Sequence, residues 1–171
     1  TGAGGAGGMA AIKSLQRTTD FELIGADMNP KGVGLYAADA GVVVPPATAD
    51  DWVESMSDCI DTHDVDVVIP LIDEEVAQIR ALRETCPDTT FVAPEAPFVD
   101  CCLDKFRLMS ELDAADIAVP ETRTVEDAVD FDESQYPLIL KPRTERGGRG
   151  IHIVHSPTEL TEALAETTRS H

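Results

Sequence analysis

A short basic and glycine-rich stretch near the end of the printed sequence has the composition of a phosphate-binding loop. It contains Lys141, Arg143, Arg146 and Arg149 together with Gly147, Gly148 and Gly150. Glycines let backbone N–H groups come close to phosphate oxygens, and the basic side chains neutralise the phosphate charge. The chain as a whole carries 32 acidic and only 13 basic residues, so this is its best candidate polyanion site. The alternative is a hairpin tip whose arginines only aid solubility.

The elements around this loop place Lys141 at the end of an apolar strand. The run Pro-Leu-Ile-Leu before Lys141 predicts a strand over 136–142, and a second strand is expected over 150–154. A lysine is costly to bury unless it meets an anion. The pattern therefore predicts that Lys141 leaves the strand toward a phosphate group, followed by the loop.

A rival motif lies at the other end of the sequence. Gly2, Gly4 and Gly7 fit the spacing G-x-G-x-x-G of dinucleotide-binding turns, and Asp27 follows the next strand, where a ribose-binding acid belongs. This alternative predicts an NAD(P)-dependent oxidoreductase or epimerase. A Tyr-x-x-x-Lys pair for hydride chemistry is missing, however. The glycines could equally line an acceptor-substrate pocket or form only a tight turn.

Polar residues that follow predicted strands are the candidates for such a substrate pocket. The carboxyl ends of parallel strands meet at one edge of a sheet, where ligands bind. The candidates are Gly4, Gly5, Asp27, Asn29, Asp73 and Glu74. For the acids at 73–75, stabilisation of a helix N-terminus is the commoner explanation.

The distribution of apolar residues predicts an α/β fold with a Rossmann-like parallel sheet and helices on both faces. Strands are expected over 21–26, 41–44, 65–70 and 90–93, and helices over 7–17, 50–62 and 74–86. A further strand is expected immediately before Thr1, because a glycine-rich turn normally follows a strand.

The pattern changes near two prolines at 94 and 97, which predicts domains over 1–94 and 95–171. The second domain is expected to be a small α+β unit. Its expected elements are a helix of about 15 residues after Pro97, an extended segment over 116–123, a small helix over 125–130, the two strands described above, and a final helix over 157–168.

Two segments of this second domain resemble the ATP-grasp family. Residues 141–150 (KPRTERGGRG) resemble the family's K-P-x-x-x-x-G-G-x-G flap. Residues 103–106 (LDKF) followed by 117–122 (IAVPET) are similar to a second family segment, in the family's order. The group around the large subunit of carbamoyl-phosphate synthase is the most similar. The resemblance implies a pre-ATP-grasp domain over 1–94 and a first ATP-grasp subdomain over 95–171, truncated before the second lobe.

The resemblance also implies roles for individual residues. Lys105 and Lys141 would contact ATP phosphates, with Arg143 and Arg146 beside them, and Gly147, Gly148 and Gly150 would form the flap. An exposed helical lysine is the alternative for Lys105. Family ligands for Mg²⁺ lie further downstream, so neither the metal site nor the catalytic residues are expected within these 171 residues.

The activity that follows is an ATP-dependent carboxylate–amine (C–N) ligase acting through an acyl phosphate, with ATP and Mg²⁺ as cofactors. Its partners would be a small carboxylate or bicarbonate and an amine or ammonia, and a homodimer is compatible with it. A non-catalytic nucleotide-binding or regulatory module is a third interpretation.

Charge and composition indicate which partners and which cellular location to expect. The formal net charge of −19 disfavours nucleic acid as a partner. No apolar run is long enough for a membrane span and no signal peptide is evident, which favours a cytoplasmic protein. The spread-out acidity resembles that of halophilic proteins. The four cysteines show neither metal-ligand nor disulfide spacing.

Overall fold

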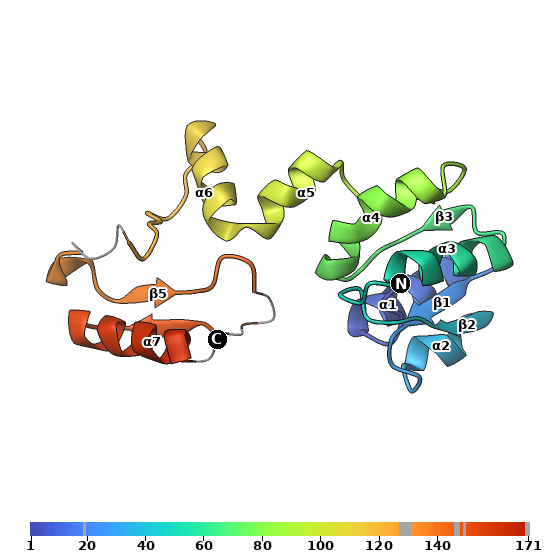
Figure 1. The fold of residues 1–171 in the computed structure, drawn as a ribbon, viewed down its shortest axis with the longest axis horizontal. Coiled ribbons are helices and arrows are strands. Elements are labelled where there is room, and N and C mark those ends of the chain that lie inside the picture. Colours follow the sequence, from blue (N-terminus) through green and yellow to red (C-terminus); the bar gives the residue numbers. More distant parts are fainter. Residues whose placement is uncertain (19, 127–130, 146–147, 149, 170–171) are drawn as a thin grey trace. The chain divides into compact units, whose positions relative to one another are not determined.

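The computed structural model describes residues 1–18, 20–126, 131–145, 148 and 150–169. The chain divides into two compact units, Thr1–Val99 and Asp100–His171. Figure 1 shows the elements of each. We describe each unit by itself.

The first unit alternates helices and strands, as the sequence predicts. Its elements are α1 (Ala6–Thr18), β1 (Ile24–Asp27), α2 (Val33–Ala37), β2 (Ala40–Val43), α3 (Trp52–Thr62), β3 (Val67–Val68), α4 (Asp73–Thr85) and β4 (Thr90–Phe91). The pairs β1–β2 and β3–β4 are both parallel, which confirms the mixed α/β class. In the described residues of this unit, the strands are grouped into two two-stranded sheets and not one continuous sheet.

The core of this unit lies where α3 and α4 pack together. Trp52 and Leu82 have exposed fractions of 1% and 0%. Met56 and Ile60 follow Trp52 at intervals of four residues, so all three lie on one face of α3. The strand residues Val68 and Phe91 join the same cluster.

The second unit contains α6 (Lys105–Ala114), the 3₁₀ helix η2 (Glu133–Gln135), β5 (Leu138–Leu140), β6 (His152–Val154) and α7 (Pro157–Arg169). The single helix expected after Pro97 was wrong, because there are two, α5 (Ala96–Leu103) and α6. Asp104 separates them: its backbone is extended, and its carboxylate accepts hydrogen bonds from the amides of Phe106 and Arg107. An aspartate that caps a new helix in this way ends the previous one. The small helix expected at 125–130 falls largely outside the described residues.

The strands β5 and β6 form an antiparallel hairpin with Ile139 opposite Ile153. The helix α7 packs beside β6, where Val154 and Ala163 are buried. On the opposite face, Ile139 and Ile153 have exposed fractions of 65% and 62%. The hairpin therefore has one covered and one open apolar face. In the part of the chain that the structure describes, the helices are too short or too polar to cross a membrane.

Neighbouring glycines in α1 provide a test of the packing at the N-terminal turn. A Cβ on Gly8 would lie 2.5 Å from the carbonyl oxygen of Gly2, whereas a Cβ on Gly7 would meet nothing within 4 Å. We expect Gly8→Ala to lower the free energy of unfolding by about 1–3 kcal/mol, as overpacking does. Gly7→Ala is the matched control and should be neutral or raise it by about 0.5 kcal/mol. Urea denaturation of both variants measures the difference, and equal stabilities would contradict the packing.

Candidate functional site

The side chain of Lys141 lies on the open face of the hairpin. Lys141 follows β5 directly and is exposed. Side chains alternate between the two faces of a strand, so Lys141 shares the face of Ile139. An exposed cation thus extends the open apolar surface formed by Ile139 and Ile153.

Lys105 binds the loop that follows Lys141. Its ammonium group donates to the carbonyl oxygens of Arg143, at 3.3 Å, and of Glu145. Its backbone N–H also donates to the carbonyl oxygen of Arg143, at 3.0 Å. The first residue of α6 is therefore attached to the loop by side chain and backbone. Lys105 is half-buried, and in this structure its ammonium group binds carbonyl oxygens of the protein itself.

Arg143 and Asp104 form an ion pair with two hydrogen bonds. Arg143 Nε donates to Asp104 Oδ1 at 3.0 Å, and a second guanidinium nitrogen donates to Oδ2. The guanidinium also lies over the Phe106 ring, 5.4 Å from its centroid. The hydrogen bond from Arg143 lowers the pKa of Asp104, and the same bond raises the pKa of Arg143. In this structure the charge of Arg143 is thus neutralised by Asp104.

The described glycines of the loop have left-handed backbones. Gly148 and Gly150 have φ values of 76° and 65°, which side-chain-bearing residues adopt at a cost. A Cβ on Gly150 would also lie 2.8 Å from Cγ of Pro142. The predicted contributors Arg146 and Gly147 lie outside the described residues, as does Arg149.

The glycine-rich turn at the N-terminal end has its own carboxylate. Asp27 Oδ2 accepts a hydrogen bond from the N–H of Gly4 at 2.6 Å, and Oδ1 accepts one from the N–H of Asn29 at 2.8 Å. A Cβ on Gly4 would lie 2.8 Å from Cα of Gly32. The structure therefore brings Gly4, Asp27 and Asn29 together, with the carboxylate already engaged by the protein.

This geometry disfavours the dinucleotide alternative. In a dinucleotide fold the acid after the second strand binds a ribose hydroxyl, whereas here the Asp27 carboxylate accepts the N–H of Gly4, the second glycine of the fingerprint. The third glycine of the fingerprint serves close packing. Gly7, which holds that position, faces open space, and the closely packed residue is Gly8.

Among the acids at the start of α4, Glu75 is the buried one. Its exposed fraction is 6%, and the hydroxyl of Thr1 donates a hydrogen bond to it. Burial raises the pKa of Glu75, which the Thr1 hydrogen bond partly offsets. The two acids predicted as pocket candidates are less buried than Glu75: Asp73 is exposed and Glu74 is half-buried. The spacing of Glu75, Ile79 and Leu82 on one helix face was the sequence signal that could have identified it.

Within the described residues, no three His, Cys, Asp or Glu side chains converge as a metal site would require.

The sequence matches two protein-family models. Residues 4–91, just over half of the chain, match the family model of the PylC-like N-terminal domain. Residues 104–171 match that of the carbamoyl-phosphate synthase L chain ATP-binding domain.

Two curated relatives cover much of the chain. The carbamoyl phosphate synthase large chain of Ralstonia nicotianae is 25% identical over 158 residues, which is 90% of this chain and 14% of the relative. The pyruvate carboxylase of Bacillus subtilis is 28% identical over 141 residues, 75% of this chain and 12% of the relative. The chain thus spans about an eighth of the length of these proteins.

Solved structures share the fold. The biotin carboxylase domain of the Hydrogenobacter thermophilus 2-oxoglutarate carboxylase, a dimer in complex with MgADP, ADP and bicarbonate, aligns with a TM-score of 0.68 at 21% identity. The alignment covers 92% of this chain and 37% of that one. Biotin carboxylase from Campylobacter jejuni, in complex with β-γ-ATP, aligns with a TM-score of 0.67 at 18% identity, covering 92% and 38%.

The chain belongs to the ATP-grasp family of enzymes: residues 4–91 form an N-terminal domain of the PylC-like kind, and residues 104–171 belong to an ATP-binding domain of the kind found in the carbamoyl-phosphate synthase L chain.

Proposed function

We propose that this chain is the nucleotide-binding front part of an ATP-dependent ligase that activates a carboxylate or bicarbonate. The observation that carries the proposal is the exposed Lys141, which extends an open apolar strand face and precedes a glycine loop held by Asp104 and Lys105. A nucleotide combines a flat base, which favours an apolar surface, with a polyanion, which favours a cation and backbone N–H groups.

In the proposed complex, the nucleotide base packs on the open apolar face of the hairpin, and the phosphates bind the glycine-containing loop. Ile139 and Ile153 offer an apolar surface, and Lys141 extends it toward the loop. Gly148 and Gly150 leave backbone N–H groups without side chains in the way. In the proposed complex Lys141 neutralises phosphate charge directly. Lys105 contributes by holding the loop carbonyls and, once the loop moves, by binding phosphate itself.

In the proposed reaction, an oxygen of the acceptor carboxylate attacks the γ-phosphorus of ATP and ADP leaves. The acyl phosphate then reacts with an amine or ammonia: nitrogen bonds to the carbonyl carbon, phosphate leaves and the nitrogen loses a proton. Phosphoryl transfer of this kind depends mainly on positioning and charge neutralisation. Mg²⁺ is proposed to accompany ATP, and the biotin carboxylase structure with MgADP supports this.

The acceptor is proposed to meet the exposed polar residues at the carboxyl ends of the first unit's strands. Gly5, Asn29 and Asp73 are exposed there. Bicarbonate is a candidate acceptor, because it is bound in the related biotin carboxylase domain. The amine, the cytoplasmic location and the halophilic character remain proposals from the sequence.

Nucleotide binding is testable by NMR titration of the ¹⁵N-labelled chain with MgATP, MgADP and NADH up to millimolar concentrations. We expect the adenine nucleotides with Mg²⁺ to shift the amide signals of Lys141, Gly148 and Gly150. Lys141→Glu should weaken MgATP binding at least about tenfold, because it replaces attraction to phosphate by repulsion. The titrations belong in both dilute buffer and molar salt, since salt screens the chain's acidic charge.

Lys31→Glu is a control of equal charge change, because Lys31 is an exposed lysine of the other unit. It should leave MgATP binding unchanged at high salt. Shifts with NADH but none with adenine nucleotides would reject the ligase proposal in favour of the oxidoreductase. An unchanged affinity in Lys141→Glu would reject the assignment of phosphate binding to this loop.

The ion pair between Asp104 and Arg143 should hold the loop in place. Asparagine also caps helices, so Asp104→Asn keeps the start of α6 while weakening the pair. We expect faster hydrogen exchange in a peptide covering residues 141–145, measured by mass spectrometry, with α6 unchanged. Glu121→Gln, which weakens the pair between Glu121 and Arg123 of the same unit, is the control. Equal exchange in both variants would show that the pair does not order the loop.

A further inference from the structure

Arg143, the first basic residue after Lys141, is already bound to a carboxylate. Its Nε donates a hydrogen bond to Asp104 Oδ1 at 3.0 Å, and a second guanidinium nitrogen donates to Oδ2. The Arg143 side chain has an exposed fraction of 58%, against 22% for that of Asp104. The guanidinium is therefore within reach of an anion in solution, while the carboxylate is the more covered of the two partners.

The Asp104 carboxylate occupies the edge of the guanidinium that phosphates also use. Carboxylates and phosphates both bind arginine through two parallel hydrogen bonds from neighbouring N–H groups. Two anions do not fit this edge at once, and an anion on the other edge is repelled by the nearby carboxylate. A phosphate that binds Arg143 therefore competes with Asp104 for it.

The carboxylate keeps other partners when the arginine leaves. Asp104 Oδ1 also accepts hydrogen bonds from the N–H groups of Phe106, at 3.1 Å, and of Arg107, at 3.2 Å. These bonds cap α6 and do not involve Arg143. Departure of the guanidinium thus leaves the carboxylate hydrogen-bonded and partly exposed, instead of buried and unpaired. The cost of exchanging partners is limited to the ion pair itself.

We infer that Asp104 is an internal competitor of the nucleotide phosphates for Arg143, and so a specificity-determining residue of the phosphate site. When a polyphosphate binds beside Lys141, the guanidinium exchanges the carboxylate for phosphate oxygens, and Asp104 remains as the cap of α6. No covalent bond forms or breaks. The inference rests on the proposed function, because it presupposes that phosphates bind this loop.

Such competition protects the phosphate site from the other anion of the proposed reaction. The acceptor is itself a carboxylate or bicarbonate, and a free Arg143 would attract it. With Asp104 in place, a lone carboxylate gains little by exchange, because it only replaces a carboxylate that the chain already holds. A polyphosphate also reaches Lys141 and the N–H groups of Gly148 and Gly150, and these contacts offset the cost of the exchange.

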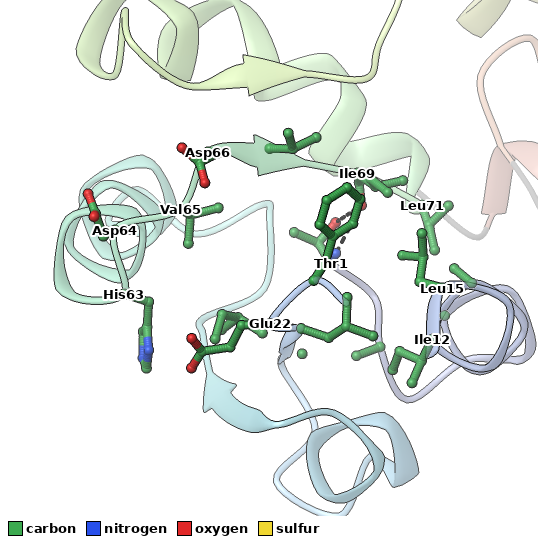
Figure 2. A pocket seen from close by; sticks show the side chains of 18 residues that line it. Thr1, Ile12, Leu15, Glu22, His63, Asp64, Val65, Asp66, Ile69 and Leu71 are labelled. Atoms are coloured by element: carbon green, nitrogen blue, oxygen red, sulfur yellow. Dashed lines mark hydrogen bonds between the residues drawn. The ribbon is translucent and has the colours of Figure 1, made fainter. Parts of the chain in front are cut away.

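A cavity of about 360 Å³ in the first unit is the other place where part of a nucleotide could bind (Figure 2). Most of its lining side chains are apolar, and the acidic ones are Glu22, Asp64 and Asp66. No lysine or arginine of the described residues lines it. The cavity therefore does not suit phosphate, but it accepts an apolar molecule. Binding at the loop has to be followed through the signals of residues in the second unit.

The test compares the affinities of the unmodified chain and of Asp104→Asn for MgATP and for magnesium-free tripolyphosphate. Affinities come from the NMR amide shifts of Lys141, Gly148 and Gly150, at one fixed salt concentration. Asparagine keeps the helix cap but releases Arg143. We expect both ligands to bind about three- to tenfold more tightly to the variant, because neither has to displace a carboxylate. Adenosine, which carries no phosphate, should bind both proteins equally.

Two controls separate competition from a general effect of charge. Glu126→Gln removes a carboxylate that attracts Arg143 through space only, and it should change the affinities by less than about twofold. Arg143→Gln removes the group for which the anions compete. Adding Asp104→Asn to it should likewise change the affinities by less than about twofold. Hydrogen exchange of the α6 amides shows that the start of the helix stays folded in each variant.

The possible results are distinct. Weaker polyphosphate binding by Asp104→Asn would show that the carboxylate holds the loop ready for the nucleotide, and would overturn the inference. An equal gain in Glu126→Gln, or in the Arg143→Gln background, would reduce the effect to general charge and also overturn it. Equal binding by the unmodified chain and Asp104→Asn overturns the inference alone. Absence of binding in both proteins rejects it together with the proposed function.

Discussion

The carboxylate of Asp104 connects the start of α6, which carries Lys105, to the loop that carries Arg143 and follows Lys141. It accepts the first amides of α6 and at the same time binds the guanidinium of Arg143. Lys105, the next residue, bonds to the carbonyls of the same loop. Because one residue is both helix cap and ion-pair partner, the position of the loop follows from the start of α6. Lys141 lies between the end of β5 at Leu140 and Arg143, the first loop residue bound by Asp104 and Lys105.

The chain has a glycine-rich segment in each unit, and the two segments differ in what the nearby carboxylate binds. At the N-terminal turn, Asp27 occupies the amides of Gly4 and Asn29, so the protein supplies its own anion there. In the second unit, Asp104 instead pairs with Arg143, and we propose that the loop glycines bind phosphate. Similar compositions thus produce a closed structural turn in one place and a ligand-binding candidate in the other. The spacing of glycines does not distinguish these outcomes.

Because the chain is strongly acidic, its few basic residues are the main groups that could attract an anionic ligand. A surface with a net charge of −19 repels polyanions in general. A nucleotide therefore needs a place that offers cations and backbone N–H groups, which is the role we propose for Lys141 and the loop after it. In the proposed function, the first unit contributes the exposed polar residues that follow its strands.

The sequence by itself determined the features that depend on residues close together in the chain, namely the helices, the strands and their ends. Apolar spacing predicted most helices and strands, and the run before Lys141 placed that lysine at a strand end. Contacts between distant segments decided the rest. The break between α5 and α6 depends on the bonds of Asp104, and the engagement of Asp27 depends on a residue 23 positions away. Likewise, Glu75 accepts a hydrogen bond from Thr1, 74 positions away. The grouping of the strands into two sheets depends on which distant strands pair, β1 with β2 and β3 with β4. The periodicity of apolar residues predicts which face of a helix or strand is buried. It does not predict the partner of a carboxylate, because that partner is often distant in sequence and comes within hydrogen-bond distance only in the folded chain.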